Sequence, residues 1–112
     1  MDRKTEKNTV LSSQAVTANT NTSGMYVGPY AEALVFIDVT AITGTLPTCL
    51  PVVQVSHDNS SWWDHTAGQE MRDVVTKYLI PVSNIGDYIR VSLTVAGTSP
   101  SFTMSVVIQA KN

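Results

Sequence analysis

The sequence is short of charge, of cysteine and of long apolar runs. Asp, Glu, Lys and Arg make up 14% of the 112 residues, whereas an ordinary soluble domain has roughly 25%. The single cysteine, Cys49, cannot form a disulfide within the chain or hold a metal cluster by itself. A net charge of −2 with seven basic residues gives no patch for nucleic acid or for a membrane surface. No apolar run approaches the roughly 20 residues that cross a bilayer.

The N-terminal segment is charged and then polar. Five of the 16 charged residues (7 basic and 9 acidic) lie within residues 1–7, and Thr, Ser and Asn dominate up to residue 23. Because no apolar segment follows these charges, we expect no secretory signal and synthesis in a cytoplasm. We predict an extended N-terminal arm over residues 1–24, with an edge strand at about 9–18 and no core of its own. Such an arm reaches a neighbouring subunit; the alternative is a disordered tail.

The body, residues 25–112, is rich in Val and Thr and is typical of strands. The clearest signals are two segments in which apolar and polar residues alternate, so that one face is buried and the other is wet. Turn residues separate the expected strands, which we place at residues 33–42, 50–56, 60–66, 71–82, 87–95 and 101–109. The sequence therefore predicts an all-β fold, a single antiparallel β-sandwich, jelly-roll-like, that carries the N-terminal arm.

Prolines bear on the prediction of two of these strands. Pro47 and Pro51 predict that the strand at 50–56 enters outside a central ladder, because proline cannot donate a ladder hydrogen bond. Residues 71–82 also fit a helical face. Their β-branched residues and Pro81 favour a strand.

One short pattern occurs twice. Residues 44–48 read Gly-Thr-Leu-Pro-Thr and residues 97–101 read Gly-Thr-Ser-Pro-Ser, each between two apolar segments. Glycine supplies a positive φ and proline fixes its own φ, so we predict two similar β-hairpins at one end of the sandwich. They form a candidate contact surface; the alternative is ordinary hairpin chemistry used twice. The interface candidates in this pattern are Gly44, Thr45, Pro47, Gly97, Thr98 and Pro100.

Few residues could carry chemistry. His57-Asp58 and Asp64-His65 flank one turn, but eight residues across a hairpin need not bring two histidines together at a metal. No nucleophile elbow or phosphate loop is present in the sequence. We therefore predict no catalytic residue, no cofactor and no metal, and expect that the protein is not an enzyme. Cys49 is expected to be a small buried apolar residue.

Trp62 and Trp63 are the most informative aromatic pair. Successive residues of a strand point to opposite faces, so we predict that Trp62 enters the core and that Trp63 is exposed. An outward Trp63 could anchor a protein interface, stack on a sugar ring, or only cover the end of the sandwich.

The order of these elements resembles a family of small virion structural proteins of tailed bacteriophages, over residues 30–109. The residues that carry the resemblance are the strand 33–40, the turn 56–64 (Ser-His-Asp-Asn-Ser-Ser-Trp-Trp-Asp), the segment 86–91, and both Gly-Thr-x-Pro patterns. Asn59 stands where the pattern has Gly, and asparagine tolerates the same left-handed backbone.

The resemblance implies a capsid decoration, or cement, protein. Such a protein is made in the host cytoplasm, resides in the virion, binds the major capsid protein and stabilises the head. It implies a homo-oligomer, a trimer on the local three-fold axes, with no nucleic acid or membrane partner. The alternative is a carbohydrate-binding module or a virion-surface adhesion domain.

Overall fold

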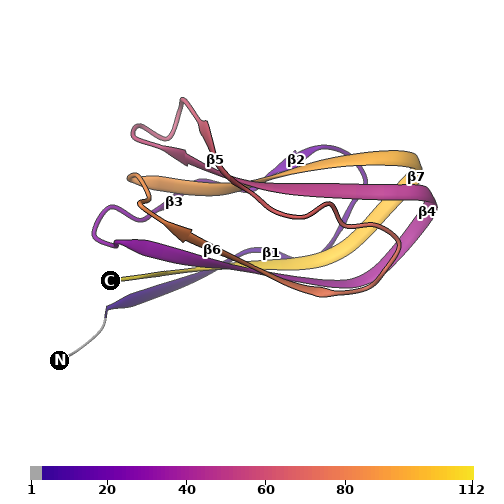
Figure 1. Ribbon diagram of the computed structural model, residues 1–112, viewed down its shortest axis with the longest axis horizontal. Helices are drawn as coiled ribbons and strands as arrows, with labels where there is room; N and C mark the ends of the chain where they lie inside the picture. The colour runs from indigo at the N-terminus through magenta and orange to yellow at the C-terminus, as the bar shows by residue number, and fades with distance from the viewer. Residues whose placement is uncertain (1–3) are drawn as a thin grey trace.

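The computed structural model describes residues 4–112 as a single antiparallel sheet of seven strands, and none of these residues forms a helix that could cross a membrane (Figure 1). β4 and β7 have 25 and 24 residues and pair along their whole length. The all-β antiparallel fold is confirmed, and the jelly-roll connectivity stays a prediction. The strands are β1 (Thr5–Val16), β2 (Thr20–Asn21), β3 (Met25–Tyr26), β4 (Glu32–Ser56), β5 (Trp63–Ala67), β6 (Lys77–Ser83) and β7 (Tyr88–Lys111).

The sheet folds back on itself because β4 and β7 both bend near their middle (Figure 1). In one half, the start of β4 and the end of β7 are flanked by β6 and β1. In the other half, the end of β4 and the start of β7 are flanked by β5 on one side and by β2 and β3 on the other. The start of β1, the C-terminus and several loops lie at the open end, away from the bend.

The core lies between the two halves and follows the predicted alternation. Ile89, Val91 and Leu93 on β7 are fully buried, whereas the residues between them are partly exposed. The same alternation continues through Phe102, Met104, Val106 and Ile108 on the far side of the bend. Each buried apolar side chain of this size stabilises the fold by roughly 1.5–3 kcal/mol, so β7 contributes to the core through both of its halves.

The two Gly-Thr-x-Pro patterns do not form hairpins, so that prediction is wrong. β4 runs through the first pattern and β7 runs through the second, and Thr45 lies opposite Thr98. Gly44 and Gly97 take φ angles of 113° and 122°, which bend both strands at the same level. Residues that would end an isolated strand here bend two paired strands together, and both strands continue beyond the bend.

The bend needs glycine for a second reason, which is the close approach of the two backbones. A Cβ on Gly44 would lie 2.7 Å from the carbonyl oxygen of Ser99. A Cβ on Gly97 would lie 2.8 Å from the carbonyl oxygen of Leu46. Each glycine therefore makes room for the backbone of the opposite bend, and the two contacts are reciprocal.

The N-terminal segment is part of this sheet. The expected edge strand is β1, which pairs with the end of β7 and contains two register shifts. Leu11 and Val16 of β1 are buried in the common core. The expectation that this segment has no core of its own is therefore wrong. Pairing with β7 places the inward side chains of β1 against the core that the rest of the sheet forms. The first three residues of the expected arm lie outside the described residues.

Prolines are accommodated differently from the prediction. Pro51 lies in a central strand, opposite Leu93, and its carbonyl oxygen accepts a hydrogen bond from the Gly68 amide at 2.8 Å. Because the N and O of a strand residue point to the same side, the missing N–H faces Gly68, just beyond β5. Pro81 lies on β6, which among residues 4–112 pairs with β4 alone. Of the expected strand at 71–82, only the part from Lys77 onward is strand.

Candidate functional site

The bend of β4 and β7 gathers six of the seven residues expected at an interface. These are Gly44, Thr45, Pro47, Gly97, Thr98 and Pro100. We call this end of the molecule, residues 44–48 and 97–101, the bend tip. The sequence reasoning passed over Leu46, the variable residue of the first pattern, which is 85% exposed at the bend tip. The equivalent residue of the second pattern is Ser99. An apolar residue in one copy of a turn pattern and a polar residue in the other is the feature of the sequence that could have pointed to Leu46.

Trp63, the seventh candidate, lies far from the bend tip. It opposes Val55 near the other end of β4 and is 53% exposed. Its ring centroid is 5.4 Å from that of His57. Trp63 therefore belongs to the open end of the molecule, with the loop that joins β4 to β5.

Trp62 is not a core residue, so that part of the prediction is wrong. It precedes β5 and is half-buried, because a residue outside the strand does not follow the strand alternation. The Cζ atom of Arg90 lies 4.3 Å from the centroid of the Trp62 ring. The indole therefore packs on the outer face of the sheet, where a cation covers it.

Arg90 belongs to a row of side chains that crosses three strands. Its Nε donates to Oε1 of Gln54 at 2.8 Å, and Nε2 of Gln54 donates to Oδ1 of Asp64 at 2.8 Å. The row runs from β7 across β4 to β5. Partial burial lowers the pKa of Arg90. Sequence periodicity marks Arg90 only as an outward residue, because its partners come from distant segments.

The loop after β4 is held by its own side chains. The Ser56 hydroxyl accepts hydrogen bonds from the amides of Asp58 and Asn59, and Oδ1 of Asp58 accepts from the amides of Ser60 and Ser61. These amide hydrogen bonds lower the pKa of Asp58 to about 2. Asn59 has a φ of 62°, as the resemblance implied for the glycine position. Across residues 4–112, His, Cys, Asp and Glu form no group of three that could hold a metal ion.

An apolar stripe lies on the outer face of β4 and β6. Phe36 and Leu79 are cross-strand neighbours and are 39% and 51% exposed. Leu34 and Pro81 form the next pair on the same face. Lys111 and Glu32 form an ion pair of 3.4 Å at one end of the stripe, and Asp38 opposes Lys77 at the other. We call Leu34, Phe36, Leu79 and Pro81 the outer stripe.

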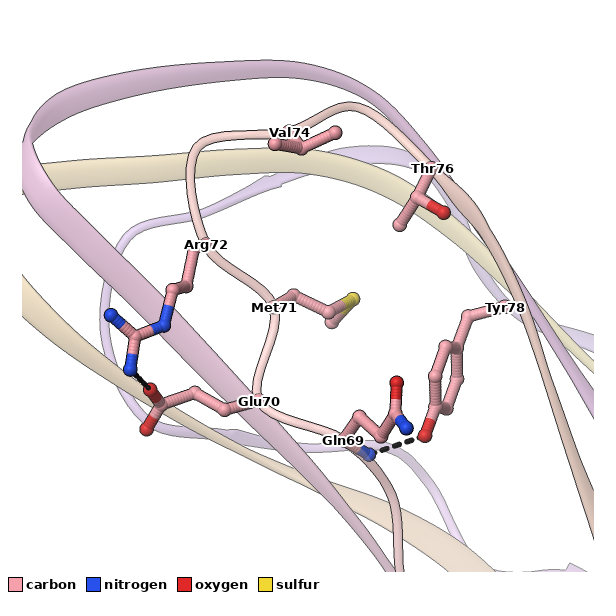
Figure 2. A pocket seen from close by; sticks show the side chains of 7 residues that line it. All are labelled: Gln69, Glu70, Met71, Arg72, Val74, Thr76 and Tyr78. Atoms are coloured by element: carbon pink, nitrogen blue, oxygen red, sulfur yellow. Dashed lines mark hydrogen bonds and ion pairs between the residues drawn. The ribbon is translucent and has the colours of Figure 1, made fainter.

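A shallow cavity of about 280 Å³ lies beneath the loop between β5 and β6 (Figure 2). The Gln69 amide donates to the Tyr78 hydroxyl at one side, and Arg72 pairs with Glu70 at 3.1 Å at another. Met71 and Val74 make much of the lining apolar. Among the described residues, the seven that line this cavity include no histidine and no cysteine.

Cys49 is a fully buried free thiol, as predicted. Its amide and carbonyl both hydrogen-bond to Met71, at 2.8 and 2.7 Å. Burial raises the pKa of the Cys49 thiol to about 11. The side chain therefore packs as a small apolar group and is protonated at neutral pH.

Comparisons with known proteins show the fold but no family. No protein-family model matches the chain, and no curated protein matches it. Among solved structures, it is similar to the crystal structure of SPBc2 prophage-derived protein YomS, with a TM-score of 0.57 and 12% sequence identity. The match covers 100% of this chain and 96% of YomS. The whole described sheet, including β1, therefore has a counterpart of the same architecture.

Proposed function

We propose that this chain is a non-enzymatic structural protein of a bacteriophage virion, most specifically a decoration protein that binds the major capsid protein and stabilises the head. Two independent features support the proposal. Its fold is similar along the full length to that of a prophage-derived protein. Its sequence resembles phage virion proteins through the same patterns that build the bend tip.

Leu46 is the observation that carries the proposal. A leucine side chain that is 85% exposed gains nothing from burial within its own chain. Leu46 also has a φ of 49°, a conformation that a non-glycine residue occupies only at a cost of order 1 kcal/mol or more. Ser99 meets the same backbone demand with a polar side chain. An exposed leucine at a strained position is thus best explained by a partner that covers it.

The partner surface that fits is an apolar pocket on a repeating protein lattice. One leucine buries too little surface for strong binding alone, but many copies on one particle add their contacts. Pro47 and Pro100 flank the bend with fixed φ angles, so the tip is rigid before binding and loses little conformational freedom.

The test is binding of purified protein to heads that lack it. We expect the wild-type chain to decorate the heads and Leu46→Ser to lose at least tenfold in occupancy at equal concentration. Ser99→Asn is the matched control, because it changes the equivalent position of the other bend; we expect full occupancy. Unchanged binding of Leu46→Ser, or no binding of the wild-type chain to heads, contradicts the proposal.

We also propose that copies associate through the outer stripe. Its apolar centre is flanked at each end by one carboxylate and one lysine, so a different surface of the next copy around a three-fold axis can cover it and meet these charges. We expect a solution mass of three chains, as the resemblance implies, and expect Phe36→Ser with Leu79→Ser to return the protein to a monomer. A wild-type monomer contradicts this association.

A further inference from the structure

Arg90 presents its guanidinium from a fixed position on the outer face of β7. Gln54 accepts a hydrogen bond from Nε, and Gln54 is itself held by Asp64. Because the Gln54 amide both accepts and donates, its orientation is determined by these two partners. The guanidinium is therefore positioned by a network that crosses three strands, rather than by its own flexible stem.

The Trp62 ring fixes the guanidinium from a second direction. The ring centroid lies 4.3 Å from Cζ of Arg90, and its six-membered ring approaches Gly24, where a Cβ would be 3.1 Å from two ring atoms. The indole is thus confined between the arginine and the chain at Gly24. A planar cation on such a ring keeps one face covered and its edge available.

The two Nη atoms of Arg90 remain accessible to solvent. Within the described residues, every buried polar side-chain atom has a hydrogen-bond partner. The two Nη atoms of Arg90 have no such partner among residues 4–112, so they are not buried. They form a preorganised pair of donors whose spacing matches the two oxygens of a carboxylate.

Aromatic rings extend the surface beside this fork. Tyr88 lies two residues before Arg90 on β7 and therefore shares its face of the sheet. Tyr26 opposes Tyr88, with ring centroids 5.4 Å apart and an interplanar angle of 62°. Tyr26 is 56% exposed. We call Arg90, Trp62, Tyr88 and Tyr26 the aromatic face.

We propose that the aromatic face binds an acidic saccharide. The guanidinium of Arg90 takes the carboxylate of a uronic acid residue, and Tyr26 packs against the adjoining sugar ring. Tyrosine suits this contact because its ring is apolar and its hydroxyl can hydrogen-bond a sugar hydroxyl. The site is separate from the bend tip and the outer stripe, so it does not depend on the capsid proposal.

The charges of the surroundings favour a single carboxylate over a phosphate polymer. Asp64 lies in the hydrogen-bonded row, and Asp58 lies in the loop that follows β4. Arg90 is the only basic residue of the aromatic face. A chain of phosphates needs several cations to replace its counterions, whereas one guanidinium fork satisfies one carboxylate.

The test is titration of the full chain with tetragalacturonate, followed by NMR and calorimetry. We expect saturable binding with shifts centred on Arg90 and Tyr26. The methyl ester of the same oligosaccharide, which keeps the rings and loses the charge, should bind at least tenfold more weakly. No saturable binding, or equal binding of the ester, overturns the proposal. A synthetic Asp- and Glu-rich peptide that binds more tightly than the saccharide also overturns it, since the ligand is then a protein.

Variants locate the binding site. Arg90→Lys keeps the charge and loses the fork, so we expect at least a tenfold loss of affinity. Arg72→Lys is the matched control, because Arg72 lies in the loop between β5 and β6, outside the aromatic face. We expect this variant to bind the saccharide with the affinity of the wild type. If Arg90→Lys does not fold, Tyr26→Ala tests the same face at an exposed position, with an expected loss of at least fivefold. Full affinity of a folded Arg90→Lys or Tyr26→Ala variant overturns the site.

Discussion

Leu46 and Ser99 share one left-handed backbone conformation, with a φ of 49° at both residues, in two bends that pack against each other. The carbonyl oxygen of each residue lies within 3 Å of where a Cβ on the opposing glycine would be. The repeated Gly-Thr-x-Pro pattern is therefore a device that turns two paired strands together. Leucine and serine meet the same backbone requirement at the variable position. The bend alone therefore does not explain the choice of leucine on β4, and we attribute it to a surface outside the chain.

Substitution of either bend glycine should destabilise the protein. Gly44→Ala and Gly97→Ala each place a Cβ within 3 Å of the opposite backbone at a φ above 110°. We expect each change to lower the free energy of unfolding by about 1–3 kcal/mol, measured from urea midpoints. Thr45→Ala is the control and should change it by less than about 0.5 kcal/mol. A glycine variant as stable as the control would show that the bend is not strained.

Truncation of Trp62 should destabilise the protein more than truncation of Trp63. Trp62 is half-buried and stacks with Arg90, whereas Trp63 is mostly exposed. We expect Trp62→Ala to lower the free energy of unfolding by about 1–3 kcal/mol, and Trp63→Ala by less than about 1 kcal/mol. Denaturant unfolding of both variants measures this. A larger loss for Trp63→Ala would contradict the placement of the two rings.

Asp58 should make stability depend on pH in acid. Its pKa falls from 3.8 to about 2 in the folded chain, first because the amides of Ser61 and Ser60 donate to its carboxylate. A folded pKa below the unfolded value gives stability that is present above pH 4 and is lost as the pH falls from 4 towards 2. Thermal melts of the wild type and Asp58→Asn should therefore differ most above pH 4 and converge near pH 2. A constant difference across this range would rule out the carboxylate as its source.

The Cys49 thiol should be unreactive in the folded protein. Its side chain is fully buried, and its pKa is raised to about 11. At pH 8 we expect modification by Ellman's reagent to be at least a hundredfold slower than in urea, where the thiol is exposed and partly ionised. Rapid modification without denaturant would show that the strand carrying Cys49 opens readily.

Local patterns predicted the strands of the core. In residues 87–95 and 101–109 the side chains alternate, and a period of two has one physical meaning, a strand with one buried face. Asn59 and Cys49 also behave as their residue types predict, because a left-handed turn and a small buried site are local requirements. These features need no knowledge of what lies across the sheet.

Other features needed the tertiary structure. Each Gly-Thr-x-Pro pattern alone reads as a hairpin, and only the pairing of Thr45 with Thr98 makes the two patterns one corner. Likewise, Trp62, Arg90 and Gln54 are brought together by a fold that joins segments far apart in sequence. Within residues 87–95 and 101–109, local periodicity was enough to predict which side chains face inward, because burial in a regular strand follows the alternation. The exposure of Leu46 at a corner and the fixed position of Arg90 against Trp62 and Gln54 follow from the register between β4 and β7, which no local pattern encodes.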